Sequence, residues 1–197
     1  MLHRASSSLL SFCGIALAFV LCYGLTTKII TPIQAIFLPE VTVFASLVFL
    51  PHGVRILSTM YFGWRALLPL MVGHWASGYL FGPGGVPDIP SLSALASLLI
   101  GAASGFVAFE IFRLLGKDYY YRGPKQTTHW KQIILVGIIA SFINSLGQVM
   151  VYRDHLEVDE YVRTTTVYAL GDVIGLFVTM LGLMLLFRWI RFAQKVL

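Results

Sequence analysis

The stretch "FLPHGVRILSTMYFGWRALLPLMVGHW", residues 49–75, is apolar enough to lie in a bilayer, yet it contains a proline near its start and four basic side chains. These residues are Pro51, His52, Arg55, Arg65 and His74. Ionisable groups at membrane depth are costly, and they usually face the interior of a helix bundle or a water-filled cavity. The stretch therefore predicts a broken membrane segment with polar groups that need buried partners.

The composition of the whole chain indicates an integral membrane protein. Of its 197 residues, 57% are hydrophobic and only 12% are charged, and the mean hydropathy is +0.80. Soluble domains are typically about 45–50% apolar and about 25% charged. A spanning helix needs roughly 20 mostly apolar residues, so residues 1–197 are expected to form one all-α transmembrane domain without a soluble domain beside it.

We expect six helical spans, the second of them broken at Pro51, His52 and Gly53, which would provide a hinge or the terminus of a half-helix. The expected spans are residues 8–30, 33–63, 66–81, 91–115, 132–152 and 165–189. Residues 33–63 fit either one kinked helix or two half-helices, because proline and glycine interrupt the apolar run. Ser91 is a suitable N-cap for the fourth span. The expected connections include a glycine- and proline-rich loop, a basic linker and a charged loop, at residues 82–91, 116–131 and 153–163.

The basic residues predict how the chain is oriented. The net charge is +5, but the lysines and arginines flank apolar runs, so the positive-inside rule explains them better than binding to nucleic acid does. Six spans place Arg65, at an expected helix–helix turn, on the same side as both termini. The other basic groups on that side are Arg4, Arg113, Lys117, Arg122, Lys125, Lys131, Arg188, Arg191 and Lys195. That side is expected to be the cytoplasm.

Glycines at helical spacing predict close helix packing. Gly101 and Gly105 lie one turn apart, as do Gly171 and Gly175, and such rows of small residues let helices approach each other in lipid. We assign Gly63 and Gly73 to the same packing role.

Several polar residues within the apolar runs are candidates for a ligand site or an interhelical polar cluster. They are Arg55, His74, Glu110, Asn144, Gln148 and Asp172. Asp172 is the predicted partner of Arg55, although the two lie in opposite halves of their spans. Glu110 fits either the cluster or a pair with Arg113, three residues further on, and His74 also fits a simple packing role.

The motifs of common catalytic sites do not occur in the sequence. It contains no G-x-S-x-G, no H-E-x-x-H and no glycine-rich phosphate loop. The five histidines lack the spacing of metal ligands, and Cys13 and Cys22, nine residues apart, fall on opposite helix faces. We therefore expect a protein that is not an enzyme and holds no metal or cofactor.

Two segments resemble the first class of membrane-associated sensor (MASE-type) domains of bacterial signalling proteins. One has a P-x-G followed by G-x-R and a later glycine, and the other has G-D-x-x-G. The matching residues are Pro51, Gly53, Gly63, Arg65, Gly73, Gly171, Asp172 and Gly175. The sequence departs from the family pattern in that His52 replaces a second proline, no tryptophan precedes Gly171, and six spans are expected where about eight are usual. The resemblance covers about residues 36–187 and implies an input module of the bacterial inner membrane that acts through a separate output polypeptide.

Three functions are compatible with these features. The first is a sensor-like membrane protein that binds a small ligand or a membrane partner. The second is an accessory or structural subunit of a larger membrane complex, and the third is a small-solute transporter or substrate-binding component, since broken helices and intramembrane charges occur at transport sites. In every case the lipid bilayer is a partner, and nucleic acid is not.

Overall fold

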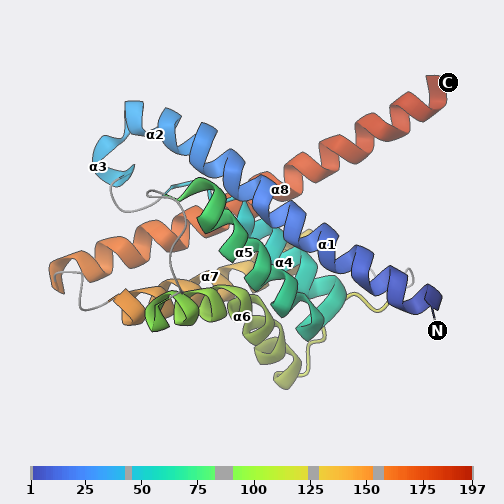
Figure 1. Cartoon of the computed structure of the whole chain (residues 1–197), viewed down its shortest axis with the longest axis horizontal. Helices are drawn as coiled ribbons and strands as arrows, with labels where there is room; N and C mark the ends of the chain where they lie inside the picture. The colour runs from blue at the N-terminus through green and yellow to red at the C-terminus, as the bar shows by residue number, and fades with distance from the viewer. Residues whose placement is uncertain (1, 43–45, 83–90, 124–128, 153–157, 197) are drawn as a thin grey trace.

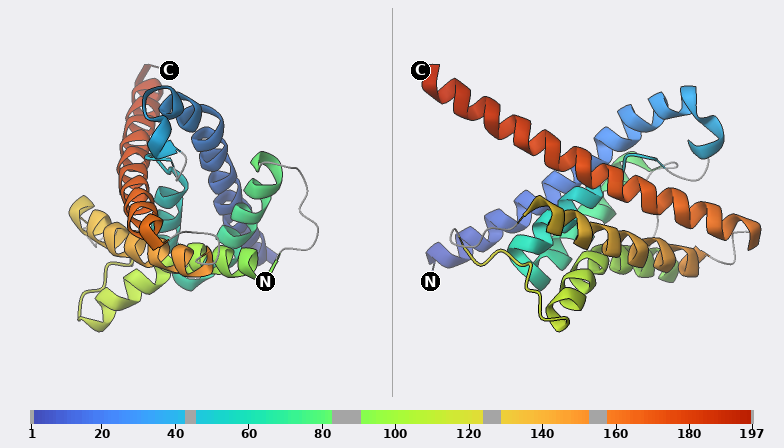
Figure 2. Two further views of the ribbon diagram at one scale, coloured as in Figure 1. Left: turned by 90° about the vertical axis from the view of Figure 1, so that its left-hand side faces the viewer. Right: turned by 180° about the vertical axis from the view of Figure 1, so that it is seen from behind.

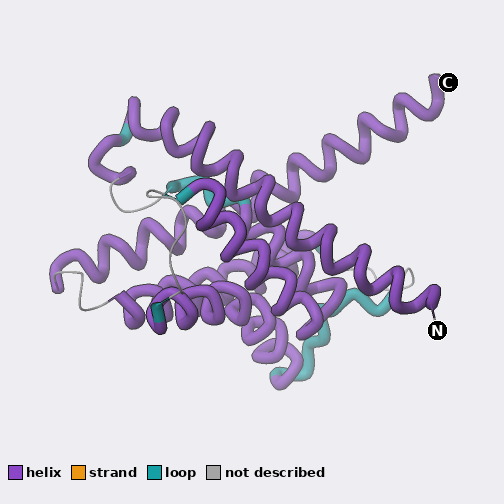
Figure 3. Tube along the Cα trace, in the orientation of Figure 1, coloured by secondary structure: helices purple, strands orange, loops and turns teal. Residues whose placement is uncertain are grey.

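The structure is a computed structural model that describes residues 2–42, 46–82, 91–123, 129–152 and 158–196. Over these residues the chain forms helices and loops and no strand (Figure 3). Five helical stretches in this part of the chain are long and apolar enough to cross a membrane: Ser8–Phe37, Pro51–Phe81, Leu92–Leu114, Trp130–Tyr152 and Tyr161–Gln194. The predicted all-helical class is confirmed, whereas the six predicted spans correspond to five such stretches.

The helices follow one another along the chain with short interruptions (Figure 1). They are α1 (Leu2–Leu25), a π-helical segment (Thr26–Ile30), α2 (Thr31–Phe37), α3 (Pro39–Thr42), α4 (Pro51–Phe62), a 3-10 turn (Gly63–Ala66), α5 (Leu67–Phe81), α6 (Leu92–Leu114), α7 (Trp130–Tyr152) and α8 (Val158–Val196). Ser91 caps α6 as predicted, because its Oγ accepts a hydrogen bond from the Ala94 N–H at 3.2 Å. Most of the glycine- and proline-rich loop, and parts of the basic linker and charged loop, lie outside the described residues.

The break in the second predicted span lies before Pro51 and not at Pro51, His52 and Gly53. Residues 46–50 are non-helical, and Pro51 occupies the first turn of α4. Proline suits this position because the N–H that it lacks would have no partner in the first helical turn. His52 and Gly53 are therefore helical, so these residues begin a helix, which is one of the two predicted alternatives, and they do not form the hinge that was the other.

The chain turns between α4 and α5. A Cβ atom added to Gly101 would lie 3.4 Å from both Arg55 Nη2 and His74 Nδ1. A straight helix would separate residues 55 and 74 by about 28 Å, so the stretch Pro51–Phe81 doubles back at Gly63–Ala66. The turn expected at Arg65 is present, and each of its two helices alone is shorter than the roughly 30 Å hydrocarbon core.

Gly63 makes this turn possible and has a different role from the one predicted. It ends α4 with φ 56° and ψ −136°, a region that residues with a Cβ rarely adopt. An added Cβ would have only Tyr120 within 4 Å, at 3.9 Å. Gly63 is therefore a turn residue and does not pack two helices together.

Helix α4 lies at the centre of the bundle, in contact with α1, α6, α7 and α8 (Figure 2). Its residues from 51 to 60 are buried except for the partly buried Leu57. By contrast, the C-terminal part of α8 extends away from the other helices (Figure 1). The start of α1 and the end of α8 lie on the same side of the molecule as the α4–α5 turn.

Candidate functional site

The first turns of α4 bring two basic side chains into the centre of the bundle. His52 is 0% exposed and Arg55 is 2% exposed. Since they are three residues apart, they lie on one helix face, and Arg55 Nη1 is 3.2 Å from His52 Nδ1. This face of α4 therefore presents a histidine and a guanidinium together.

Asp172 of α8 is the acidic centre of the cluster, and it is also 2% exposed. Its Oδ2 lies 3.3 Å from His52 Nδ1 and 3.8 Å from Arg55 Nη1. The same oxygen accepts a hydrogen bond from Asn144 Nδ2 of α7 at 2.8 Å. One carboxylate oxygen thus joins three helices, and the difference in depth inferred from the sequence does not separate Arg55 from Asp172.

The surroundings of His52 allow two protonation states with different partners. Its Nε2 lies 3.1 Å from the Gly137 carbonyl oxygen, which only accepts hydrogen bonds, so Nε2 carries a hydrogen. When Nδ1 is bare, it accepts a hydrogen bond from Arg55. When Nδ1 is protonated, it donates to Asp172 instead, so one proton decides whether His52 bonds within α4 or across to α8.

Polar side chains continue the cluster toward α6. Gln148 Nε2 donates to Asn144 Oδ1 at 3.4 Å and to the Ser97 carbonyl at 3.1 Å. Ser97 Oγ in turn donates to Gln148 Oε1 at 2.7 Å. A polar path therefore connects α4, α8, α7 and α6, and we call His52, Arg55, Ser97, Asn144, Gln148 and Asp172 the buried polar cluster.

His74 lies beside this cluster and makes no hydrogen bond with it in the described residues. Its ring packs near Phe19, with centroids 5.5 Å apart, and near Tyr23, at 6.4 Å. It shares the space over Gly101 with Arg55. Arg55 Nε is buried and has no hydrogen-bond partner, so the guanidinium is only partly satisfied by its neighbours.

The non-helical segment 46–50 lies along α8 next to the cluster. The Phe49 N–H donates to the Gly171 carbonyl at 2.9 Å, and Thr179 Oγ1 donates to the Leu50 carbonyl at 3.1 Å. A Cβ at Gly175 would collide with the Phe49 backbone. The glycines at 171 and 175 therefore accommodate non-helical backbone, whereas the sequence predicted that they pack against another helix.

The remaining packing glycines hold helices as expected from their size. A Cβ at Gly73 would lie 2.9 Å from the Ala16 carbonyl oxygen, so this glycine lets α5 approach α1. At Gly105 of α6, a Cβ would lie 3.3 Å from Thr59 Oγ1 of α4.

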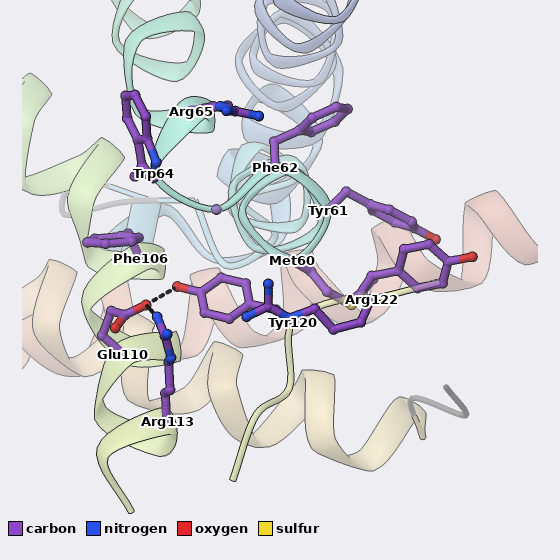
Figure 4. A pocket seen from close by; sticks show the side chains of 12 residues that line it. Met60, Tyr61, Phe62, Trp64, Arg65, Phe106, Glu110, Arg113, Tyr120 and Arg122 are labelled. Carbon is purple, nitrogen blue, oxygen red and sulfur yellow. Dashed lines mark hydrogen bonds and ion pairs between the residues drawn. The ribbon is translucent and has the colours of Figure 1, made fainter. Parts of the chain in front are cut away.

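Glu110 does not join the buried polar cluster. Its Oε1 accepts a hydrogen bond from the Tyr120 hydroxyl at 2.9 Å and lies 3.5 Å from Arg113 Nη1. Burial and this hydrogen bond to the carboxylate raise the pKa of Tyr120. Glu110 instead belongs to a separate cavity of about 290 Å³ at the α4–α5 turn (Figure 4).

Some of the residues that build these sites were not identified from the sequence. Ser97 and Thr179 looked like ordinary small polar residues in apolar helices, and Tyr120 looked like an interfacial aromatic. The sequence pattern assigns His52 to the helix break, although its spacing from Arg55 places both on one face.

Comparisons of the chain with protein-family models, curated proteins and solved structures found no match.

Proposed function

We propose that the chain is a non-enzymatic, sensor-like protein of the bacterial inner membrane. It binds a small ligand or a membrane partner and passes a conformational signal to a separate polypeptide. The observation that carries this proposal is the contact of Asp172 with His52 and Arg55, because a single proton or ligand at that point changes the bonding between α4 and α8.

The arrangement of α8 explains how such a change in bonding would be transmitted from the cluster to a partner. The segment 46–50 and α4 are attached to α8 at Gly171, Asp172 and Thr179. The same helix continues beyond the bundle (Figure 1). A shift of α8 against α4 would therefore move the projecting end, where a partner would read it.

The cluster supports signalling better than the two alternative functions. Arg55 and Asp172 are buried inside this chain, so they do not form a contact surface for another subunit of a complex. A transport site needs a cavity that a solute can enter, and the 290 Å³ cavity is lined by none of the cluster residues.

We also propose that the chain crosses the membrane six times with both termini in the cytoplasm. In this arrangement α4 and α5 are two short passes joined at Arg65. The basic residues near the ends of α6 and α8 support this orientation through the positive-inside rule.

Affinity capture from native membranes in mild detergent tests the proposed function. The wild-type chain is expected to retain a membrane protein or a small molecule detectable by mass spectrometry, and Asp172→Asn is expected to change the amount retained. Leu181→Ala, at an exposed position of α8, is the control and should behave as wild type. Purification of the wild type as a lone monomer without any bound molecule would contradict the proposal.

A further inference from the structure

The cavity at the α4–α5 turn has the features of a binding site and is separate from the buried polar cluster. Its volume is about 290 Å³. It is lined by Met60, Tyr61, Phe62, Gly63, Trp64, Arg65, Phe106, Glu110, Arg113, Tyr120, Tyr121 and Arg122. Three chain segments therefore meet there: the turn itself, the end of α6 and the start of the α6–α7 connection that follows it.

Positively charged side chains outnumber negatively charged ones in the lining of the cavity. Its lining contains three arginines and one carboxylate. Glu110 is engaged by Tyr120 and Arg113, and Arg122 is held by Asp118 at 2.9 Å just outside the lining. With these pairs accounted for, the cavity keeps a net positive charge.

Arg65 supplies that charge. Among the described residues it forms no hydrogen bond or ion pair, and its guanidinium lies 5.8 Å from the Trp64 ring. Figure 4 shows Arg65 across the cavity from Glu110 and Arg113. A planar guanidinium with free donors favours phosphate, which it binds through paired hydrogen bonds.

The aromatic side chains around the cavity place it where lipid headgroups occur. Trp64 is 66% exposed, Tyr61 54% and Phe62 41%. Tryptophan and tyrosine gather at membrane–water interfaces, and basic pockets between membrane helices bind anionic headgroups there. The apolar rims would contact acyl chains while the arginines face the phosphate.

We propose that this cavity binds a phosphate ester, with Arg65 as its principal ligand and Arg113 as the second cation. A phospholipid headgroup and a soluble phosphate ester share this chemistry. The two sources differ in whether binding requires the acyl chains.

The test is lipid binding by the purified full chain, measured by native mass spectrometry with phosphatidylglycerol and with phosphatidylcholine. We expect a preference for phosphatidylglycerol, which Arg65→Gln weakens about tenfold, the effect of losing one charge-assisted hydrogen bond. Lys131→Gln is the matched control, because Lys131 is also exposed and also lies 5.8 Å from a tryptophan ring, that of Trp130. It should leave the preference unchanged.

A second variant tests the proposal in the opposite direction. Glu110→Gln removes the carboxylate beside Arg113 and should strengthen binding of phosphatidylglycerol. A parallel titration with glycerol phosphate identifies the source: competition shows that the phosphate group alone suffices, whereas no competition assigns the site to the lipid. Two results would overturn the proposal. One is equal binding of the two lipids together with no binding of glycerol phosphate. The other is an equal loss of phosphatidylglycerol binding in Arg65→Gln and Lys131→Gln.

Discussion

At the scale of single residues, the central feature is a pair of opposite charges buried within apolar helices. Arg55 and Asp172 are each 2% exposed and lie 3.8 Å apart. A buried ion pair often adds little net stability, but removing one partner leaves the other charge buried and uncompensated. Neutralising one member of the pair is therefore expected to lower the stability of the protein much more than neutralising both together.

Arg55→Met should destabilise the protein by about 3–5 kcal/mol, because it leaves the Asp172 carboxylate without its cation. Asp172→Asn should also destabilise the protein, and the double variant should be less destabilised than the sum of the two single variants. Thermal unfolding in detergent measures all three. Arg188→Met, at an exposed position, is the control with little expected effect. Additive losses in the double variant would show that Arg55 and Asp172 do not interact.

At the scale of elements, α8 binds a segment of non-helical backbone. The carbonyl of Gly171, the missing side chain of Gly175 and the hydroxyl of Thr179 hold residues 46–50 along successive turns. This arrangement satisfies backbone groups of the broken segment, which is essential where no water is present.

Gly175→Ala should destabilise the protein by about 1–3 kcal/mol through overpacking, because the new methyl group would overlap the Phe49 backbone. Gly182→Ala lies on the same helix and is the matched control, since an added Cβ there meets nothing within 4 Å. Unfolding midpoints of the two variants give the comparison. Equal unfolding midpoints would show that segment 46–50 does not pack against Gly175.

The sequence predicts part of this organisation, and the limits have physical reasons. Arg55 and Asp172 stand out because charges inside apolar runs need partners. The small residues at 171 and 175 have the same spacing whether a helix or a non-helical segment packs on them, so the predicted packing against another helix is wrong. Glu110 has two partners within reach by sequence, Arg113 or the cluster, and only the structure shows that it pairs with Arg113 and with Tyr120 of the following connection.

At the scale of the whole molecule, the stretch Pro51–Phe81 decides the topology. Its length and composition fit one span, but the turn at Gly63–Ala66 folds it back. A folded stretch leaves residues on either side of it on one face of the membrane, whereas a straight one separates them.

Cysteine labelling in intact cells tests this topology on a chain in which Cys13 and Cys22 are replaced by serine. Phe37→Cys and Ser91→Cys, before and after the folded stretch, should both react with a membrane-impermeant maleimide. Lys117→Cys should react only after permeabilisation. Labelling of Phe37→Cys and Ser91→Cys from opposite sides would contradict the six-pass arrangement.

The central claim is that the proton state of His52 sets how α4 bonds to α8, and pulsed electron paramagnetic resonance tests it most directly. Spin labels at Leu68 on α5 and Met184 on α8, both exposed, report the position of α8 relative to the α4–α5 pair. The groups facing His52 are Arg55 and Asp172, and His74 lies next to Arg55.

The measurement compares about pH 8 with about pH 4, a range wide enough to include the protonation of a buried histidine. The account predicts that the distance distribution shifts on acidification, that His52→Gln abolishes the shift, and that His74→Gln retains it. An unchanged distribution in the wild type, or the same shift in His52→Gln, would contradict it.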